Sequence, residues 1–285
     1  MGKIKLTRIN LDSNKIESKI VLISDIHYSR KSDMIKLEKV LDNIQKINPH
    51  YICILGDTLD QAKISDENEI VNWLSKLASY SKVIMIHGNH DLAIYDTHCA
   101  YYNEQLFNKI GKIQNLVLLN NEMYVENGIN FIGLNLGYDY YYEDHENHDS
   151  FVAHYNKIIH KLDTNNYNIL LSHTPIALTK EENLKRLNDY KNIDLVLCGH
   201  MHGGLTPEFL RPILKTRGLL SPNKKNLLIK YAYGNFKILS VNFMVTSGVT
   251  KLSSVSNANC FDCLFRPEIV DINIDLKDFD KTNRK

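Results

Sequence analysis

Short apolar runs alternate with stretches of helical spacing through most of the chain. Runs such as KIVLIS and YICILG are apolar at consecutive positions, which is typical of strands buried on both faces. Between them, MIKLEKVLDNIQKI and ENEIVNWLSKLASY carry apolar residues three and four positions apart, which predicts amphipathic helices. The predicted strands are 19–24, 51–56 and 82–88, and the predicted helices are 34–47 and 67–80. This alternation indicates an α/β architecture.

The same pattern continues with weaker helices and then changes character in the last quarter. Helical spacing recurs near 102–110 and at 150–162, and the apolar runs between and after these stretches predict strands at 115–119, 123–136, 168–172 and 194–199. From about residue 227 the chain is β-rich, and consecutive strands of a mixed or antiparallel sheet are predicted at 235–242, 243–248 and 268–275. Without an internal repeat, a low-complexity tract or a linker, residues 1–285 are expected to form a single domain.

Composition and charge exclude several classes of protein. The chain has 285 residues, of which 44% are hydrophobic and 24% charged, as in ordinary globular proteins. Thirty-four basic and 33 acidic residues leave a net charge of +1, so no overall field attracts nucleic acid or an anionic membrane. We therefore expect no stable nucleic-acid partner.

The apolar runs, the first twenty residues and the cysteines indicate where the protein is located and whether its thiols are reduced. No apolar run approaches the roughly 18 residues of a membrane span, and the first twenty residues lack the pattern of a signal peptide, so we expect a cytoplasmic protein. The five cysteines cannot all pair, which favours reduced thiols. Cys260 and Cys263 form a single C-x-x-C, for which a redox role is the weaker interpretation because no second pair accompanies it.

Acidic and imidazole side chains gather just after predicted strands. Because the carboxyl ends of strands in an α/β sheet fan their loops toward one crevice, five separate loops are expected to bring these groups together. The loops read SDIH, GDTLD, GNHD, SHTP and GHMH. Their metal-ligating residues are Asp25, His27, Asp57, Asn89, His173, His200 and His202.

This set of ligand types has a chemical meaning. Carboxylate oxygen and imidazole nitrogen suit divalent Mn, Fe, Zn or Co. Seven ligands exceed the need of one tetrahedral ion but serve two ions if one carboxylate bridges them. Two metals about 3.5–4 Å apart are the usual device for in-line displacement at phosphorus. A dinuclear phosphoesterase site is therefore predicted.

The ordered motifs D-x-H, G-D-x-x-D, G-N-H-D, H and G-H-x-H resemble the calcineurin-like metallophosphoesterase superfamily from Asp25 to His202. The end of the chain, with S247-G-V and R266-P-E-I-V, further resembles the YkuE-like bacterial phosphodiesterases. The fold that this resemblance implies is a four-layer αββα sandwich, two mixed β-sheets flanked by helices. The β-rich part from about residue 227 would complete the second sheet.

The resemblance also implies roles for individual residues. Asp25, His27 and His202 would hold the first metal; Asn89, His173 and His200 would hold the second; Asp57 would bridge them. Two divalent ions, Mn²⁺ first and Fe, Zn or Co otherwise, would hold a bridging hydroxide that attacks phosphorus. His90 would protonate the leaving oxygen, and Asp60 would orient His90, a duty that Asp91 could share.

The residues that follow the G-D-x-x-D motif bear on the class of substrate. Related protein phosphatases continue G-D-x-x-D with Arg-Gly, whereas Asp60 is followed here by Gln61 and Ala62. An anionic phosphate ester, small or lipid-linked and most simply a diester, is therefore expected. The alternative is a non-catalytic metal-binding scaffold or regulatory module of the same fold.

Two segments and one histidine carry competing interpretations. Residues 138–149 are either a solvated loop or a lid in which Tyr138, Tyr140, Tyr141 or Tyr142 stacks on a base or sugar. Residues 205–230, basic and interleaved with leucines, are either a crossover packed on the sheet or a surface for peripheral membrane contact. His87 is expected in the core rather than in the chemistry.

Overall fold

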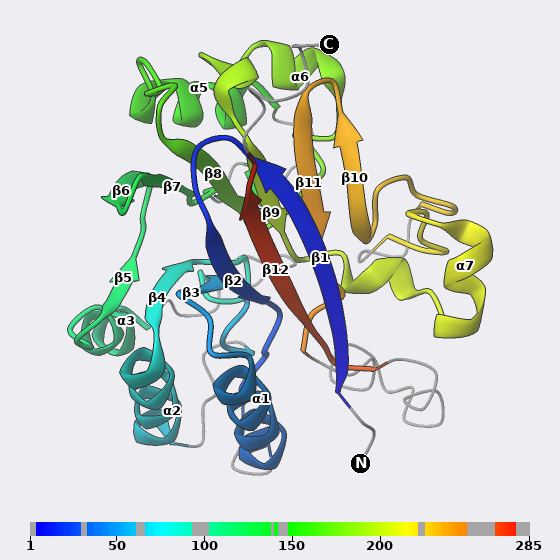
Figure 1. Ribbon diagram of the computed structural model, residues 1–285. Coiled ribbons are helices and arrows are strands. Elements are labelled where there is room, and N and C mark those ends of the chain that lie inside the picture. Colours follow the sequence, from blue (N-terminus) through cyan, green and yellow to red (C-terminus); the bar gives the residue numbers. More distant parts are fainter. Residues whose placement is uncertain are drawn as a thin grey trace.

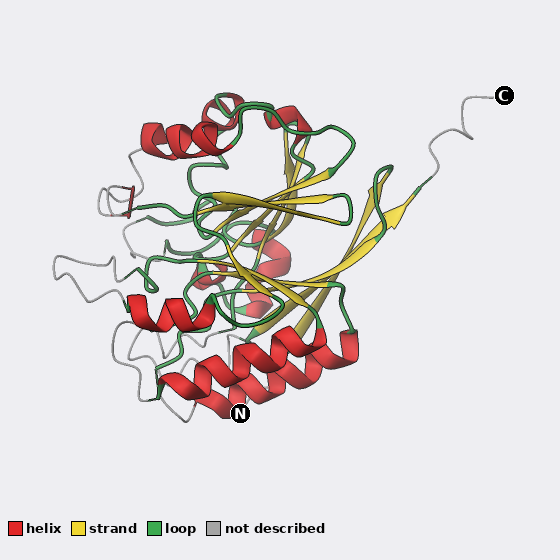
Figure 2. Cartoon of the chain, turned by 90° about the vertical axis from the view of Figure 1, so that its left-hand side faces the viewer, coloured by secondary structure: helices red, strands yellow, loops and turns green. Residues whose placement is uncertain are grey.

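The computed structural model describes residues 4–29, 33–60, 66–92, 103–137, 140–141, 148–221, 226–249 and 266–277. Two six-stranded sheets pack against each other, and helices cover their outer faces (Figures 1 and 2). The predicted α/β sandwich of two mixed sheets is confirmed.

The first sheet has the order β1-β12-β2-β3-β4-β5. Its strands are β1 (Lys5–Ser13), β2 (Ser18–Ile23), β3 (Tyr51–Leu55), β4 (Lys82–Ile86), β5 (Leu116–Leu118) and β12 (Glu268–Leu276). Strands β2 to β5 are parallel, and β12 is antiparallel to β2 but parallel to β1. Helices α1 (Met34–Ile47), α2 (Glu67–Tyr80) and α3 (Glu104–Ile110) cover the outer face.

The second sheet has the order β10-β11-β9-β8-β7-β6. Its strands are β6 (Glu122–Glu126), β7 (Ile129–Leu134), β8 (Tyr167–Ser172), β9 (Leu195–Cys198), β10 (Gly234–Ile238) and β11 (Val241–Val245). Helices α5 (His148–Ile158) and α6 (Glu181–Lys185) pack on its outer face. The central strands β7, β8, β9 and β11 are parallel, so their carboxyl ends meet at one edge.

Three apolar layers explain why the strands read as continuous apolar runs. In β2, Ile20 and Leu22 face the other sheet, while Val21 and Ile23 face α1 and α2. Successive side chains point to opposite faces of a strand, and here both faces are covered, so no position favours a polar residue. The free cysteines Cys53 and Cys198 are buried in these layers; Cys260 and Cys263 lie outside the described residues.

Several predicted strands differ from the observed ones at their turns. The run predicted at 123–136 is a hairpin of β6 and β7, and its turn at Asn127 and Gly128 has positive φ angles of 49° and 74°. The run 235–242 is likewise divided, because Leu239, with φ 54°, begins the turn between β10 and β11. Apolar periodicity continues through a short turn, so it does not locate the reversal.

The C-terminal part does not belong to one sheet. Strands β10 and β11 lie in the second sheet, whereas β12 inserts between β1 and β2 of the first. This corrects the expectation that the whole part from about 227 completes the second sheet. Strand β1, for which no strand was predicted, pairs with β12 along its full length from Lys5↔Glu268 to Ser13↔Leu276. Pairing between the two ends of a chain leaves no local pattern in the sequence.

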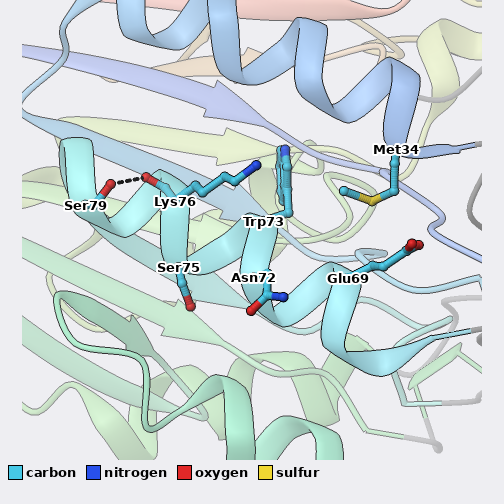
Figure 3. Close-up of a pocket in the computed structure, with 7 residues that line it drawn as sticks. All are labelled: Met34, Glu69, Asn72, Trp73, Ser75, Lys76 and Ser79. Atoms are coloured by element: carbon cyan, nitrogen blue, oxygen red, sulfur yellow. Dashed lines mark hydrogen bonds between the residues drawn. The ribbon is translucent and has the colours of Figure 1, made fainter.

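A surface groove of about 620 Å³ runs between α1 and α2 on the outside of the helical layer. Figure 3 shows Met34 of α1 facing Trp73 and Glu69 of α2 across it. Trp73 donates a hydrogen bond to the Leu37 carbonyl at 2.9 Å, which closes the bottom of the groove. None of the predicted site residues lines it, so the groove is separate from the chemistry described next.

Candidate metal centre

The predicted ligands follow the carboxyl ends of strands from both sheets. Asp25, Asp57 and Asn89 come after β2, β3 and β4, whereas His173 and His200 come after β8 and β9. Two hydrogen bonds join the two sets of loops: His173 Nδ1 to the Leu55 carbonyl at 2.6 Å, and the His200 backbone N–H to Asp25 Oδ2 at 3.1 Å. The packing of the two sheets thus brings residues far apart in sequence to one place.

The side chains form two groups that share a border. In each group the ligand atoms lie within 4.8 Å of one another; Asp25, His27 and His202 form the first, and Asp57, His173 and His200 the second. His27, Asp57 and His90 form a further set of this kind across the border between them. Asp57 Oδ2 is 3.6 Å from His27 Nε2 and 3.1 Å from His173 Nε2. One oxygen of Asp57 therefore lies between the two groups, where a bridging ligand would have to be.

Asn89 and His90 reach this border from the turn after β4. Asn89 is buried, and the backbone N–H of His90 donates to Asp57 Oδ1 at 2.8 Å. That bond ties the turn to the same carboxylate whose other oxygen faces the histidines. All seven predicted ligands are thus at or beside one centre.

The donor atoms fit divalent metals. Asp25 Oδ1 and His27 Nε2 are buried and make no hydrogen bond to the residues that the structure describes, an arrangement that is costly unless a cation satisfies them. His173 donates from Nδ1 to the Leu55 carbonyl. Its Nε2 is thereby directed at Asp57 Oδ2 and His200 Nδ1, each 3.1 Å away, and metal-ligating histidines are oriented by such a bond from their other nitrogen. Hard oxygen with imidazole nitrogen is a suitable donor set for Mn, Fe, Zn or Co.

The backbone is strained at the same residues. Five predicted ligands have φ angles between 45° and 66°: Asp25, His27, Asp57, His200 and His202. This left-handed region is unfavourable for residues with a side chain and is enriched at functional sites. The strain turns each side chain out of its strand toward the centre.

Asp60 lies between two imidazoles. Its Oδ1 is 3.5 Å from His90 Nδ1 and 3.7 Å from His27 Nδ1. Asp91 instead accepts from the backbone N–H groups of Leu59 and Gly88, both at 2.9 Å. Asp60 is therefore the carboxylate placed to orient His90, while Asp91 fastens the turn that carries Asn89.

Electrostatics reflect this crowding of charge. Burial raises the pKa of Asp57, but His173, His90 and His27 lower it well below its usual range. Burial lowers the pKa of His173, yet Asp57 outweighs burial and raises that pKa to about 9. For His202 burial dominates, and its pKa falls to about 4 despite Asp25. A divalent ion would thus compete with a proton at His173 but not at His202.

Two tyrosines of the segment 138–149 are described, one buried in the core and one close to the ligand histidines. Tyr140 is fully buried among the side chains under α5. The ring of Tyr141 is half-buried, 6.1 Å from that of His200 and 6.4 Å from that of His173. Tyr138 and Tyr142 lie outside the described residues. His87 packs 4.5 Å from the Phe107 ring, and burial lowers its pKa to about 4, as expected for a core residue.

Gly199 packs so closely against Ser24 and Asp25, beside the first ligand group, that there is no room for a side chain. A Cβ at this position would lie 1.9 Å from Ser24 Oγ and 2.7 Å from Asp25 Oδ2. We expect Gly199→Ala to displace Asp25, to destabilise the fold by roughly 1–3 kcal/mol and to weaken metal binding. Thermal unfolding and metal content measure the two effects.

Gly111→Ala is the matched control, because its Cβ would come no nearer than 3.4 Å to another atom. Equal losses in the two variants would contradict the packing argument.

The match to known families agrees with this geometry. Residues 18–204 match the model of the calcineurin-like phosphoesterases. The chain belongs to this family. The match extends from the start of β2 past His202 and so contains all the residues placed at the centre.

Relatives known by sequence carry the same family name. An uncharacterized metallophosphoesterase of Helicobacter pylori is 28% identical over 204 residues, which cover 71% of this chain and 49% of the relative. One from Campylobacter jejuni is 25% identical over 209 residues, covering 71% and 48%. The chain thus spans about half the length of these curated relatives.

A shorter match reaches a relative with a named substrate. A UDP-2,3-diacylglucosamine pyrophosphatase of Chlamydia muridarum is 30% identical over 77 residues, covering 27% of this chain and 23% of that protein. The matched family is one of phosphoesterases, and the names of these relatives agree with it. None of the helices in the described part of the chain is long and apolar enough to cross a membrane.

Proposed function

We propose that the protein is a dinuclear metal-dependent phosphodiesterase that hydrolyses an anionic phosphate ester. The observation that carries this proposal is Asp57, with one oxygen 3.6 Å from His27 and 3.1 Å from His173 at the border of two ligand groups. Asp25, His27 and His202 would hold one ion, Asn89, His173 and His200 the other, and Asp57 would contact both. Two divalent ions, with Mn²⁺ as first expectation, would neutralise charge on the phosphoryl oxygens and activate water.

The remaining groups act on the substrate. His90 is bound through its backbone to Asp57 and faces Asp60 through Nδ1. That contact would leave Nε2 to donate a proton to the leaving oxygen. Tyr141, beside His173 and His200, would flank the ester on the side of the second ion, which retains the stacking role predicted for this segment.

A small or lipid-linked diester is the substrate class that we favour. Gln61 and Ala62 stand where related protein phosphatases have Arg-Gly, so the chain lacks a guanidinium that would grip a phosphomonoester at that place. The similarity to a pyrophosphatase of a diacylated sugar nucleotide supports a lipid-linked anion. The net charge of +1 offers little attraction for nucleic acid.

The test is metal reconstitution. We expect metal-stripped protein to be inactive and Mn²⁺ to restore cleavage of bis(p-nitrophenyl) phosphate in preference to p-nitrophenyl phosphate. Preference for the monoester would contradict the diesterase assignment but leave the metal centre standing. Two bound ions without turnover of either ester, in Mn²⁺, Fe²⁺, Co²⁺ or Zn²⁺, would favour the non-catalytic scaffold.

A further inference from the structure

The chain directly after the metal ligands forms an irregular hairpin that is anchored beside the centre. Its two arms pair through Gly218 N–H to the Ile229 carbonyl at 2.8 Å and Leu228 N–H to the Leu219 carbonyl at 2.9 Å. Leu220 N–H donates to the Gly204 carbonyl at 3.0 Å. Gly204 is two residues after His202, so the hairpin is held against the loop of the first ligand group.

Helix α7 (Arg211–Leu214) and the preceding turn η4 (Glu208–Leu210) are fastened to the same hairpin. Arg211 is buried, and its guanidinium lies over the Tyr233 ring at 4.7 Å. Tyr233 Oη donates in turn to the Arg211 carbonyl at 3.2 Å. Figure 1 shows α7 and the loops after it projecting beside β10. We call residues 207–221 and 226–231 the platform.

The platform exposes large apolar side chains although it is well anchored. Phe209 is 66% exposed, Ile213 75%, Leu227 75% and Leu228 52%. Phe209 and Ile213 are four positions apart on consecutive helical turns, so they share a face. Four of the ten exposed large apolar residues in the described part of the chain therefore lie on this one segment. Clustered apolar exposure of this kind marks an interaction surface rather than scattered surface residues.

The exposed charges of the platform are positive. Lys215, Arg217 and Lys230 are exposed, and the hairpin register places Arg217 opposite Lys230. Like charges directly opposite one another on paired strands are unfavourable unless an anion lies near them. The one acidic residue of the platform, Glu208, pairs with Arg266 at 3.5 Å, so it does not neutralise these cations.

We propose that the platform docks onto the surface of an anionic phospholipid bilayer and brings the metal centre against it. Exposed apolar side chains flanked by cations are the combination that inserts into the headgroup region and attracts anionic lipid. A purely apolar protein partner would leave the exposed Lys215, Arg217 and Lys230 without counter-charges, whereas anionic headgroups supply them next to an apolar layer. That lipid-linked esters are the substrate is a consequence that rests on the proposed function; the docking itself does not.

The test is co-sedimentation with vesicles. Wild-type protein is expected to bind vesicles of phosphatidylcholine with phosphatidylglycerol, to bind phosphatidylcholine alone poorly, and to dissociate at high salt. Phe209→Ser with Ile213→Ser should weaken binding roughly tenfold by removing inserted apolar surface. Arg217→Gln with Lys230→Gln should weaken binding to anionic vesicles roughly 25-fold, about fivefold for each cation, with little effect on neutral ones.

The matched control changes exposed apolar residues elsewhere. Met123 and Val125 on β6 are 42% and 52% exposed, and Met123→Ser with Val125→Ser should bind as the wild type does. Failure of the wild type to bind anionic vesicles, or equal losses in the control, would overturn the proposal. A dimer in light scattering that Phe209→Ser dissociates would assign the platform to a second copy instead. Asp57→Asn should still bind vesicles, which separates docking from catalysis.

Discussion

Asp57→Asn is expected to abolish phosphoesterase activity, with a loss of roughly a thousandfold or more. A single oxygen of Asp57 lies close to imidazole nitrogens of both groups, 3.6 Å from His27 and 3.1 Å from His173. An amide would keep the shape but remove the charge that two cations would share. Metal ions contribute several kcal/mol of transition-state stabilisation, and each 1.36 kcal/mol is a factor of ten in rate.

Metal content gives this prediction a second measurement. Elemental analysis after reconstitution should find two ions in the wild type and fewer in Asp57→Asn. His154→Asn is the control, since His154 lies on α5 and contacts Ser150 rather than the centre; it should keep both ions. An active Asp57→Asn variant with a full complement of metal would refute the bridging role.

His90→Asn is expected to lower kcat by a factor of roughly 10²–10⁴, the usual contribution of a general acid, while metal content stays at the wild-type level. The reason is its position: the His90 ring meets the His27 ring edge-on at 4.6 Å, and its Nδ1 faces Asp60. His90 lies in a set with His27 and Asp57, but the proposed ligand set does not include it. Loss of metal together with activity would show that His90 is a ligand instead.

The role of Asp60 is resolved by a double-mutant cycle with His90. If Asp60 acts by orienting His90, Asp60→Asn should reduce kcat in the wild type but have little further effect in His90→Asn. Asp60 also approaches His27 at 3.7 Å, so additive losses would mean that it acts through the first ligand group. A substrate with a good leaving group should be less sensitive to His90→Asn, because that leaving oxygen needs no proton.

Much of the fold was predictable because each sheet is covered on one face by helices and on the other by the second sheet, which makes its strands apolar throughout. The helices at 34–47 and 67–80 coincide with α1 and α2, since each has one apolar face toward a sheet and a polar face toward solvent. The strands before the ligand motifs were equally clear, because strands buried on both faces lack polar residues. Turns such as Asn127–Gly128 were not predicted, because the apolar pattern continues through them. The pairing of β1 with β12 was not predicted either, because it joins residues more than 250 positions apart.

The candidate site divides in the same way. Residue types, order and spacing in five motifs were sufficient to propose a ligand set and to expect two ions, since that chemistry depends on which donors are present. The sequence left open whether Asp91 shares the role of Asp60; in the structure Asp60 faces His90, whereas Asp91 accepts hydrogen bonds from two backbone N–H groups. The sequence offered four tyrosines for the stacking role without distinguishing them. In the structure the ring of Tyr141 lies beside His173 and His200.

The sequence thus indicates which chemical groups each motif supplies, but it does not indicate which motifs lie next to one another. The motifs determined the donor set, and apolar periodicity determined most strands and helices, because both depend on residues close together along the chain. Only the packing of two sheets could place Asp57 between His27 and His173, bury Arg211 of the basic segment under Tyr233, and leave Phe209 and Ile213 exposed. Those outcomes depend on contacts between distant segments, which the tertiary structure alone determines.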